Sequence, residues 1–246
     1  MVGLVLSLLA VAAGGAGRGA IKPAAPPPHV LNIVHHRLKR GTSATYAALE
    51  ASIVTAFERA KMPLYWMTFQ STQDPRAILY LNLFDAPDGL SRASDAYRAL
   101  SPAHPELSKL SARLSTLIEG EESVLTTRRD EVAYSRADVD FSTLRALMLV
   151  TFHVNAGHEG KFMDAVRKAG GSGAPWIVYE ANAEPTFVLL APLRSRAETR
   201  RPAPIPRPIR ELRGVYRRAA VELYTLAPAM SRLAGSRPSP VAGHQP

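Results

Sequence analysis

An internal repeat is the feature that most constrains the fold of this chain. Both copies open with an apolar, strand-like run, at 30–38 and again at 146–154. A glycine turn follows each run, at Gly41 and at Gly157, and residues with helical spacing come next. Two further strand-like runs then flank an Asp-Pro turn in the first copy and a Glu-Pro turn in the second. The sequence therefore predicts one structural unit built twice.

Each copy predicts the order strand, helix, strand, strand, helix, strand, which is the ferredoxin-like unit. The first helix is expected at 43–61 in one copy and at 159–169 in the other, and the last helix of the second copy shrinks to a short one at 209–218. Such a unit leaves one sheet face bare, and a second copy can cover it. We predict an α+β fold in which two ferredoxin-like β-α-β-β-α-β repeats form an intrachain dimeric α+β barrel, as a monomer with an internal pseudo-dimer.

Four parts are expected along the chain: a signal peptide-like segment with a Pro-rich linker at 1–29, repeat 1 at 30–135, repeat 2 at 136–232, and a disordered tail at 233–246. The apolar run at 2–13 is too short for a bilayer-spanning helix, which needs about 20 residues. Small residues follow it, as in secretory signal peptides. We therefore predict no transmembrane segment in the mature chain and a periplasmic or secreted location. A low-complexity tail is the alternative, because no Lys or Arg precedes the run.

Most of the net charge of +9 comes from the stretch 194–218, where nine arginines and two acidic residues give +7. Four prolines at alternate positions predict an extended, solvated Arg/Pro-rich loop at 194–208. Arginines can bind phosphates or an anionic surface. The stretch lacks the aromatic interleaving and the helical motifs of nucleic-acid-binding proteins, so nucleic acid is disfavoured as a partner.

Three local patterns stand out: the Lys39-Arg-Gly41 turn before an amphipathic helix, Pro63 before an aromatic strand, and the similar endings at 131–134 and 227–231. Together they resemble the dimeric α+β barrel superfamily, which includes antibiotic-biosynthesis-monooxygenase-like and NIPSNAP-like proteins. The resemblance covers roughly residues 30–232. It implies a cofactor-free oxygenase, a haem-degrading enzyme or a member without known activity, so it does not select one function.

Strand alternation predicts which side chains face the space between the two sheets. The apolar set at 148, 150, 152 and 154 is expected under the helices, which leaves the other parity for the space between the sheets. We also expect one parity of the two hairpins to face it. The residues predicted to converge there are His35, Arg37, Trp66, Tyr80, Asn82, His153 and Glu180.

Two functions are compatible with this set. In the first, an exported, non-catalytic protein binds a small apolar or aromatic ligand between its sheets through Arg37, Trp66, Tyr80, Asn82 and Glu180. In the second, a cofactor-independent or haem-using monooxygenase-like enzyme uses His35 or His153 as a base or haem ligand. Structural roles are open as well: His35 and His153 as satisfied or surface histidines, Trp66 as a core residue, and Arg37 and Glu180 paired with solvent or with each other.

Sharper chemical signatures are missing from the sequence. Zero cysteines exclude disulfides, thiolate zinc sites and cysteine nucleophiles. His158-Glu159 lacks the second histidine of the zinc protease motif, and no acidic cluster has the spacing of a calcium or magnesium site. We therefore expect no metal and no cofactor, except for haem, which the resemblance leaves open. Whether the protein is an enzyme is not decided by motifs.

Overall fold

The computed structural model describes residues 27–132, 141, 144–170, 176–193, 195–202 and 204–233. The predicted signal peptide-like run at 2–13 lies outside the described residues, as does the tail from residue 234. Within the described ranges, no helix combines the length and the apolar composition that crossing a membrane requires.

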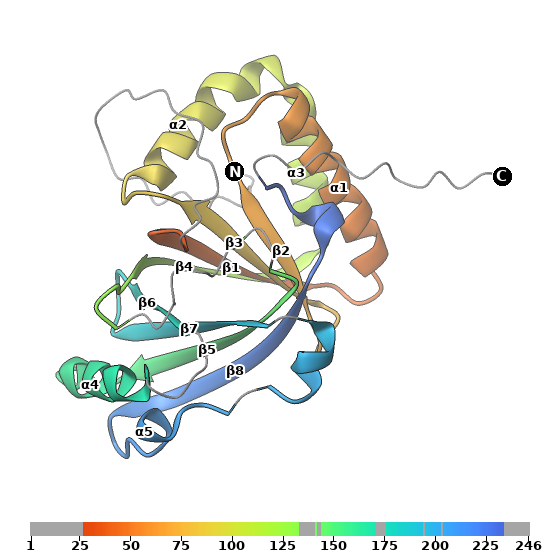
Figure 1. Ribbon diagram of the computed structural model, residues 1–246. Coiled ribbons are helices and arrows are strands. Elements are labelled where there is room, and N and C mark those ends of the chain that lie inside the picture. Colours follow the sequence, from red (N-terminus) through yellow and green to blue (C-terminus); the bar gives the residue numbers. More distant parts are fainter. Residues whose placement is uncertain are drawn as a thin grey trace.

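Eight antiparallel strands close into one barrel (Figure 1), in the order β1-β3-β2-β8-β5-β7-β6-β4. The strands are β1 (Val30–Leu38), β2 (Trp66–Ser71), β3 (Ala77–Phe84), β4 (Ile118–Arg128), β5 (Ala146–Val154), β6 (Ile177–Ala181), β7 (Thr186–Leu193) and β8 (Tyr216–Leu226).

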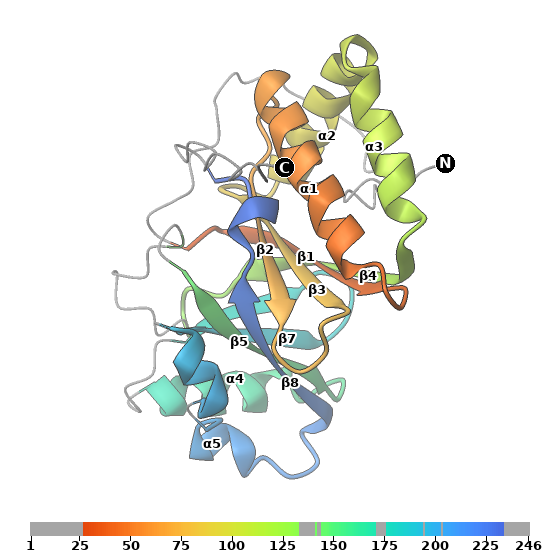
Figure 2. The ribbon, with the colours of Figure 1, turned by 90° about the vertical axis from the view of Figure 1, so that its right-hand side faces the viewer.

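All the helices lie outside the barrel, with α1, α2 and α3 on the half formed by β1–β4 and the shorter α4 and α5 on the other half (Figures 1 and 2). The helices are α1 (Ser43–Arg59), α2 (Gly89–Leu100), α3 (Pro105–Ser115), α4 (Glu159–Ala169) and α5 (Arg207–Arg210), with 3-10 turns η1 (Ser101–Ala103), η4 (Arg196–Arg200) and η5 (Pro228–Met230).

The two halves of the barrel correspond to the two sequence repeats. Strands β4-β1-β3-β2 form one half and β8-β5-β7-β6 form the other, and the pairs β2–β8 and β4–β6 join them. The turns after β1 and β5 both contain a glycine with positive φ, Gly41 at 76° and Gly157 at 78°. The predicted α+β barrel of two ferredoxin-like repeats is confirmed.

Both repeats differ from the prediction near their last strand. In repeat 1, helix α3 ends at Ser115 and β4 starts at Ile118, whereas the sequence pattern predicts that this helix continues to residue 118. In repeat 2, the helix predicted at 209–218 is reduced to α5, and β8 starts at Tyr216 because this part of the chain pairs with β5. Pro208 lies in the first turn of α5, where no backbone N–H is needed.

Apolar side chains pack in three layers. One cluster lies between α1–α3 and the outer face of repeat 1, and a second lies between α4–α5 and the outer face of repeat 2. The third cluster fills the barrel, where residues from both repeats meet Phe141 and Leu144 of the connecting segment. The connection between the repeats therefore contributes to the interior of the barrel.

The barrel interior is packed with apolar side chains. Leu31, Phe69, Leu81, Leu149 and Phe141 retain no accessible surface. A side chain that lined a cavity large enough for water would retain some. No room is left for a ligand around these residues, because leucines and aromatic rings from both halves fill that space. Ligand binding elsewhere between the sheets stays a prediction.

Gly89 lies where a larger residue has no room, which gives a first prediction. A Cβ atom at this position would lie 2.6 Å from Cβ of the buried Phe84. We expect Gly89→Ala to lower the free energy of unfolding by about 1–3 kcal/mol in urea titrations. The matched control is Gly160→Ala in α4, where nothing lies within 4 Å and alanine favours the helix by up to about 1 kcal/mol. Equal effects at the two sites would contradict the prediction.

Candidate functional site

The seven residues predicted to converge do not form one pocket. Trp66, Tyr80 and Asn82 lie on the outer face of the sheet, toward the helices, because Tyr80 pairs with Val34 and Trp66 with Asn82. Directly paired residues share a face, and Val34 belongs to the set under the helices. Trp66 packs edge-on against Phe57 of α1, with ring centres 5.2 Å apart.

Arg37 and Glu180 form ion pairs instead of lining a cavity. Arg37 is more than half exposed, and its guanidinium lies 3.7 Å from Asp74 and 3.9 Å from Glu119. Glu180 accepts a hydrogen bond from Arg129. Both residues thus have structural contacts, but with partners other than the solvent or mutual pairing considered for them. Their binding roles, and the catalytic roles of the two histidines, stay predictions.

His35 faces the barrel interior as predicted, at the end where polar residues replace the apolar packing. Its Nδ1 lies 3.4 Å from the Tyr224 hydroxyl and 3.8 Å from a Glu222 carboxyl oxygen, and Tyr224 donates to Glu222 at 2.9 Å. Burial lowers the pKa of His35, against the opposing effect of the carboxylates of Glu222 and Glu122. His153 lies near the end of β5, where its Nδ1 is 3.2 Å from the Thr186 hydroxyl.

A buried polar network occupies the space between α1 and the sheet in repeat 1. We call Glu50, Tyr80, Tyr46, His36 and Glu121 the polar network. His36 Nδ1 lies 2.7 Å from the Tyr46 hydroxyl, which is hydrogen-bonded to the Tyr80 hydroxyl. Both tyrosine hydroxyls interact with the Glu50 carboxyl, whose Oε1 atom has no hydrogen-bond partner. At the other end, His36 Nε2 lies 3.3 Å from a carboxyl oxygen of Glu121, whose side chain is 24% exposed.

Burial changes the proton affinity of the inner part of the network. It raises the pKa of Glu50 to about 8, although hydrogen bonds from Tyr80 and Tyr46 act in the opposite direction. Burial and the neighbouring Glu50 also raise the pKa of both tyrosines. At neutral pH the carboxyl of Glu50 is therefore protonated and both phenols keep their protons.

Several buried polar atoms at this site lack a hydrogen-bond partner. They include Glu50 Oε1, Asn32 Nδ2 and His36 Nε2, the last of which has Glu121 in ion-pair range but without hydrogen-bond geometry. Asn32 accepts from Ser123 at 2.9 Å through its side-chain oxygen. A buried polar atom without a partner costs about 1–3 kcal/mol. Such a cost is tolerated more often at functional sites than in a core.

Repeat 2 fills the same positions with apolar residues. Tyr46 and Glu50 lie five and nine residues after Gly41, and Phe162 and Val166 lie five and nine residues after Gly157. The strand pairs correspond as well: His36–Ile78 becomes Phe152–Phe187, and Val34–Tyr80 becomes Val150–Leu189. The fold therefore closes without a polar network, which points to a role of the network beyond folding.

Of the polar network, sequence reasoning identified only Tyr80, and it placed that residue on the wrong face. Neither Glu50 nor His36 was among the candidate site residues. The signal that could have found them is the comparison of the two copies position by position after their glycine turns. A glutamate on the buried face of one helix, where the other has valine, is the informative difference.

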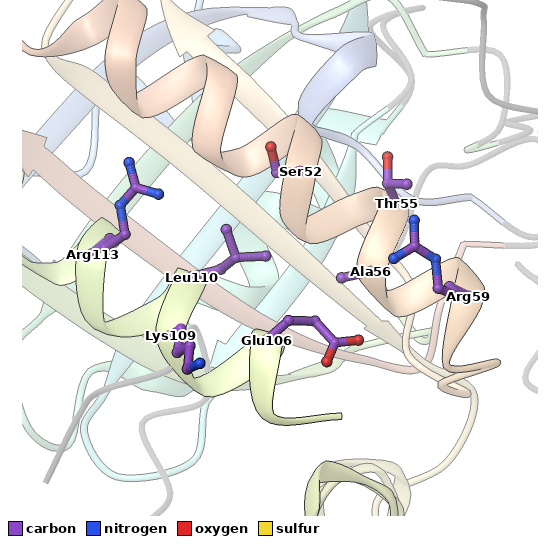
Figure 3. Close-up of a pocket in the computed structure, with 8 residues that line it drawn as sticks. All are labelled: Ser52, Thr55, Ala56, Arg59, Glu106, Lys109, Leu110 and Arg113. Carbon is purple, nitrogen blue, oxygen red and sulfur yellow. The ribbon is translucent and has the colours of Figure 1, made fainter. Parts of the chain in front are cut away.

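A separate groove lies between α1 and α3 (Figure 3). Its volume is about 430 Å³, and its lining is Ser52, Thr55, Ala56, Arg59, Glu106, Lys109, Leu110 and Arg113. Three of these side chains are cationic and one is anionic. No residue of the polar network lines the groove, so it gives no direct access to Glu50.

The arginine-rich stretch is helical in part, which corrects the expectation of a fully extended loop at 194–208. It contains η4 and α5, while residues 194 and 203 lie outside the described residues. Its described arginines are all exposed, and Arg207 pairs with Glu211 at 2.7 Å. These exposed arginines lie on the surface of repeat 2, whereas the polar network lies in repeat 1.

Haem is the cofactor that the resemblance leaves open, and His36 does not fit it as an axial ligand. An axial histidine needs a free ring nitrogen that faces room for the macrocycle. His36 has Tyr46 at one nitrogen and Glu121 at the other, and His35 has Tyr224 and Glu222 near its Nδ1. The groove in Figure 3 contains no histidine, and no cluster of three potential metal ligands occurs among the described residues. We derive no step through haem.

No family profile and no curated protein sequence matches this chain. Solved structures do match its fold. A proposed monooxygenase from Lactobacillus acidophilus NCFM is 11% identical with a TM-score of 0.53, and the match covers 80% of this chain and 93% of that one. An anthrone oxidase-like protein is 9% identical with a TM-score of 0.54, covering 82% and 93%.

A chlorite dismutase variant from Candidatus Nitrospira defluvii is also similar, at 8% identity and a TM-score of 0.53, covering 82% of this chain and 93% of that one. At such identities these likenesses show the fold alone, which is the dimeric α+β barrel that the sequence resemblance implied. The protein is thus a tandem dimeric α+β barrel with a buried polar network in one half.

Proposed function

We propose that the protein is a cofactor-independent monooxygenase-like enzyme whose acid–base site is the polar network of repeat 1. The carrying observation is that Glu50, Tyr46, Tyr80 and His36 are buried at positions where repeat 2 is apolar, and that Glu50 Oε1 and His36 Nε2 have no hydrogen-bond partner. The neighbours described as a monooxygenase and as anthrone oxidase-like support the proposal at the level of fold. Export to the periplasm or the exterior stays a prediction.

The proposed reaction converts an acidic methylene beside an aromatic ring into a ketone. A base removes one C–H proton, and the resulting carbanion adds dioxygen and takes up a proton to give a hydroperoxide. Loss of the second C–H proton then breaks the O–O bond, and the leaving hydroxide takes a proton to form water. Methylene plus dioxygen thus gives ketone plus water, with dioxygen as the oxidant. The site must accept protons and return them, for which histidine and a neutral carboxyl are suited.

The outer face of β4 is the side from which a substrate would approach. Glu121 and Ser123 are exposed there, and they contact His36 and Asn32 on the neighbouring strand. A substrate over these residues would meet His36 Nε2 and Asn32 Nδ2, which have no hydrogen-bond partner inside the described protein. Its aromatic part would lie outside the packed cluster under α1.

The test is oxygen consumption by the purified protein with an anthrone-type substrate and a metal chelator, together with the absorbance of the quinone product. We expect His36→Gln to lower the rate by about 100-fold or more, because a general base contributes about 10²–10⁴-fold. His104→Gln, between η1 and α3, is the matched control and should keep the wild-type rate. Equal rates in the two variants would overturn the proposal. The same assay measures the roles predicted for His35 and His153.

A further inference from the structure

We propose that Glu121, His36, Tyr46 and Tyr80 form a proton path between solvent and the carboxyl group of Glu50. The path deepens the proposed function, and it rests on that function only for the use of the proton in turnover. The exchange of the Glu50 proton with solvent is a property of the resting protein. It can be measured without any substrate.

The contacts are continuous from the surface to the buried carboxyl. Glu121 is partly exposed and lies 3.3 Å from His36 Nε2. On the opposite edge of the same ring, Nδ1 lies 2.7 Å from the Tyr46 hydroxyl. Tyr46 is hydrogen-bonded to Tyr80, and the Glu50 carboxyl interacts with both hydroxyls. Only the carboxyl groups at the two ends of the path, those of Glu121 and Glu50, have to come into hydrogen-bond geometry for a proton to pass.

Each member can receive one proton while it releases another. A hydroxyl donates and accepts, and imidazole binds a proton at either nitrogen. In the outward direction, Glu50 gives its proton to Tyr80, and Tyr80 gives its own hydroxyl proton to Tyr46. Tyr46 in turn gives its hydroxyl proton to His36 Nδ1. His36 releases the proton on Nε2 to an acceptor at the outer end. Four bonds to hydrogen break and four form, which leaves Glu50 as a carboxylate without any redox change.

The surroundings of Glu50 keep the proton available at neutral pH. The titratable groups that act on it are Tyr80 from β3 and Tyr46 from its own helix, while Glu121 acts on Tyr46 from β4. None of these groups is a cation. The carboxyl therefore stays neutral and can supply the proton that the leaving hydroxide needs in the proposed reaction.

Repeat 2 supports the assignment as an internal comparison. The positions of Tyr46, Glu50 and His36 hold Phe162, Val166 and Phe152, which pack in the same places without exchangeable protons. Both Phe152–Phe162 and His36–Tyr46 are ring contacts between the first strand and the first helix of a repeat. The contact is thus shared by both halves, and only repeat 1 has the chemistry to conduct protons through it.

The experiment follows the carbonyl stretch of the protonated Glu50 carboxyl by infrared spectroscopy after the full-length protein is mixed with heavy water. Glu50→Gln should lack the band, which assigns it. Tyr46→Phe and Tyr80→Phe should keep the band but slow its shift by at least about tenfold, because each removes one hydroxyl from the path. Tyr97→Phe, on the nearby helix α2, is the matched control and should exchange at the wild-type rate.

Glu121→Gln tests the outer end at an exposed position, where folding is not at risk. It should slow the exchange while the band stays in place. Exchange at the wild-type rate in Glu121→Gln and in a folded Tyr46→Phe would overturn the proton path. Because the readout needs no turnover, a lost path with intact oxygen consumption refutes only the path. Normal exchange without oxygen consumption refutes only the proposed function.

Discussion

Glu50→Gln is expected to remove most of the pH dependence of stability in the neutral range. The folded protein holds a proton on Glu50 up to about pH 8, while the ordinary value for an unfolded glutamate is 4.5. Between these values the folded state binds the extra proton, so stability is highest below the lower value and falls as pH rises through the upper one. At about 1.4 kcal/mol per pH unit, the wild type should lose about 2–3 kcal/mol between pH 5.5 and pH 7.5.

Urea titrations at both pH values measure this difference. Glu58→Gln is the matched control, because Glu58 lies on the same helix but is partly exposed, and it should keep the wild-type pH dependence. The glutamine variant should also be more stable than the wild type at pH 8 and above, where the wild type must bury a carboxylate. The same loss of stability in wild type and Glu50→Gln would show that the carboxyl of Glu50 is charged in the folded state.

Phe141→Ala is expected to lower the free energy of unfolding by about 3–5 kcal/mol, the usual cost of removing a buried phenylalanine. Phe141 belongs to the connecting segment between the repeats, yet its ring has no accessible surface and packs in the barrel interior. Its loss should leave a dry cavity between the two halves. Urea titration gives the stability, and a rise in stability on adding benzene to the variant alone would report the cavity.

Val221→Ala is the comparison for this prediction, because Val221 is 40% exposed on β8 and its truncation should change stability by less than about 0.5 kcal/mol. If Phe141→Ala lowers the free energy of unfolding by less than about 1 kcal/mol, the connecting segment does not stabilise the packing of the barrel interior. The repeats would then depend on each other only through their strands.

The fold could be predicted because the sequence patterns that define it are local and occur in both repeats. Alternation in 148–154 identified the side of β5 under the helices, and the same parity was correct for β1. Gly41 and Gly157 marked the same turn in both copies. The missed boundary of β8 has a non-local cause, since residues from Tyr216 onward become a strand by pairing with β5.

The site was harder to predict because it depends on strand register. A shift of one residue moves a whole strand to the other face, and the sequence of a hairpin does not fix its register against a third strand. For this reason Trp66, Tyr80 and Asn82 were assigned to the interior although they face the helices. The importance of Glu50 depends on what surrounds it, since the same glutamate on an open helix face would be an ordinary surface residue.

Joining the two halves in a single polypeptide has an evolutionary consequence. A barrel assembled from two identical subunits carries every substitution twice, so both halves keep the same side chains. Here each half is encoded separately, and a change in one need not suit the other. One half can therefore bury polar groups that are costly to bury, while the other keeps apolar packing in the same places.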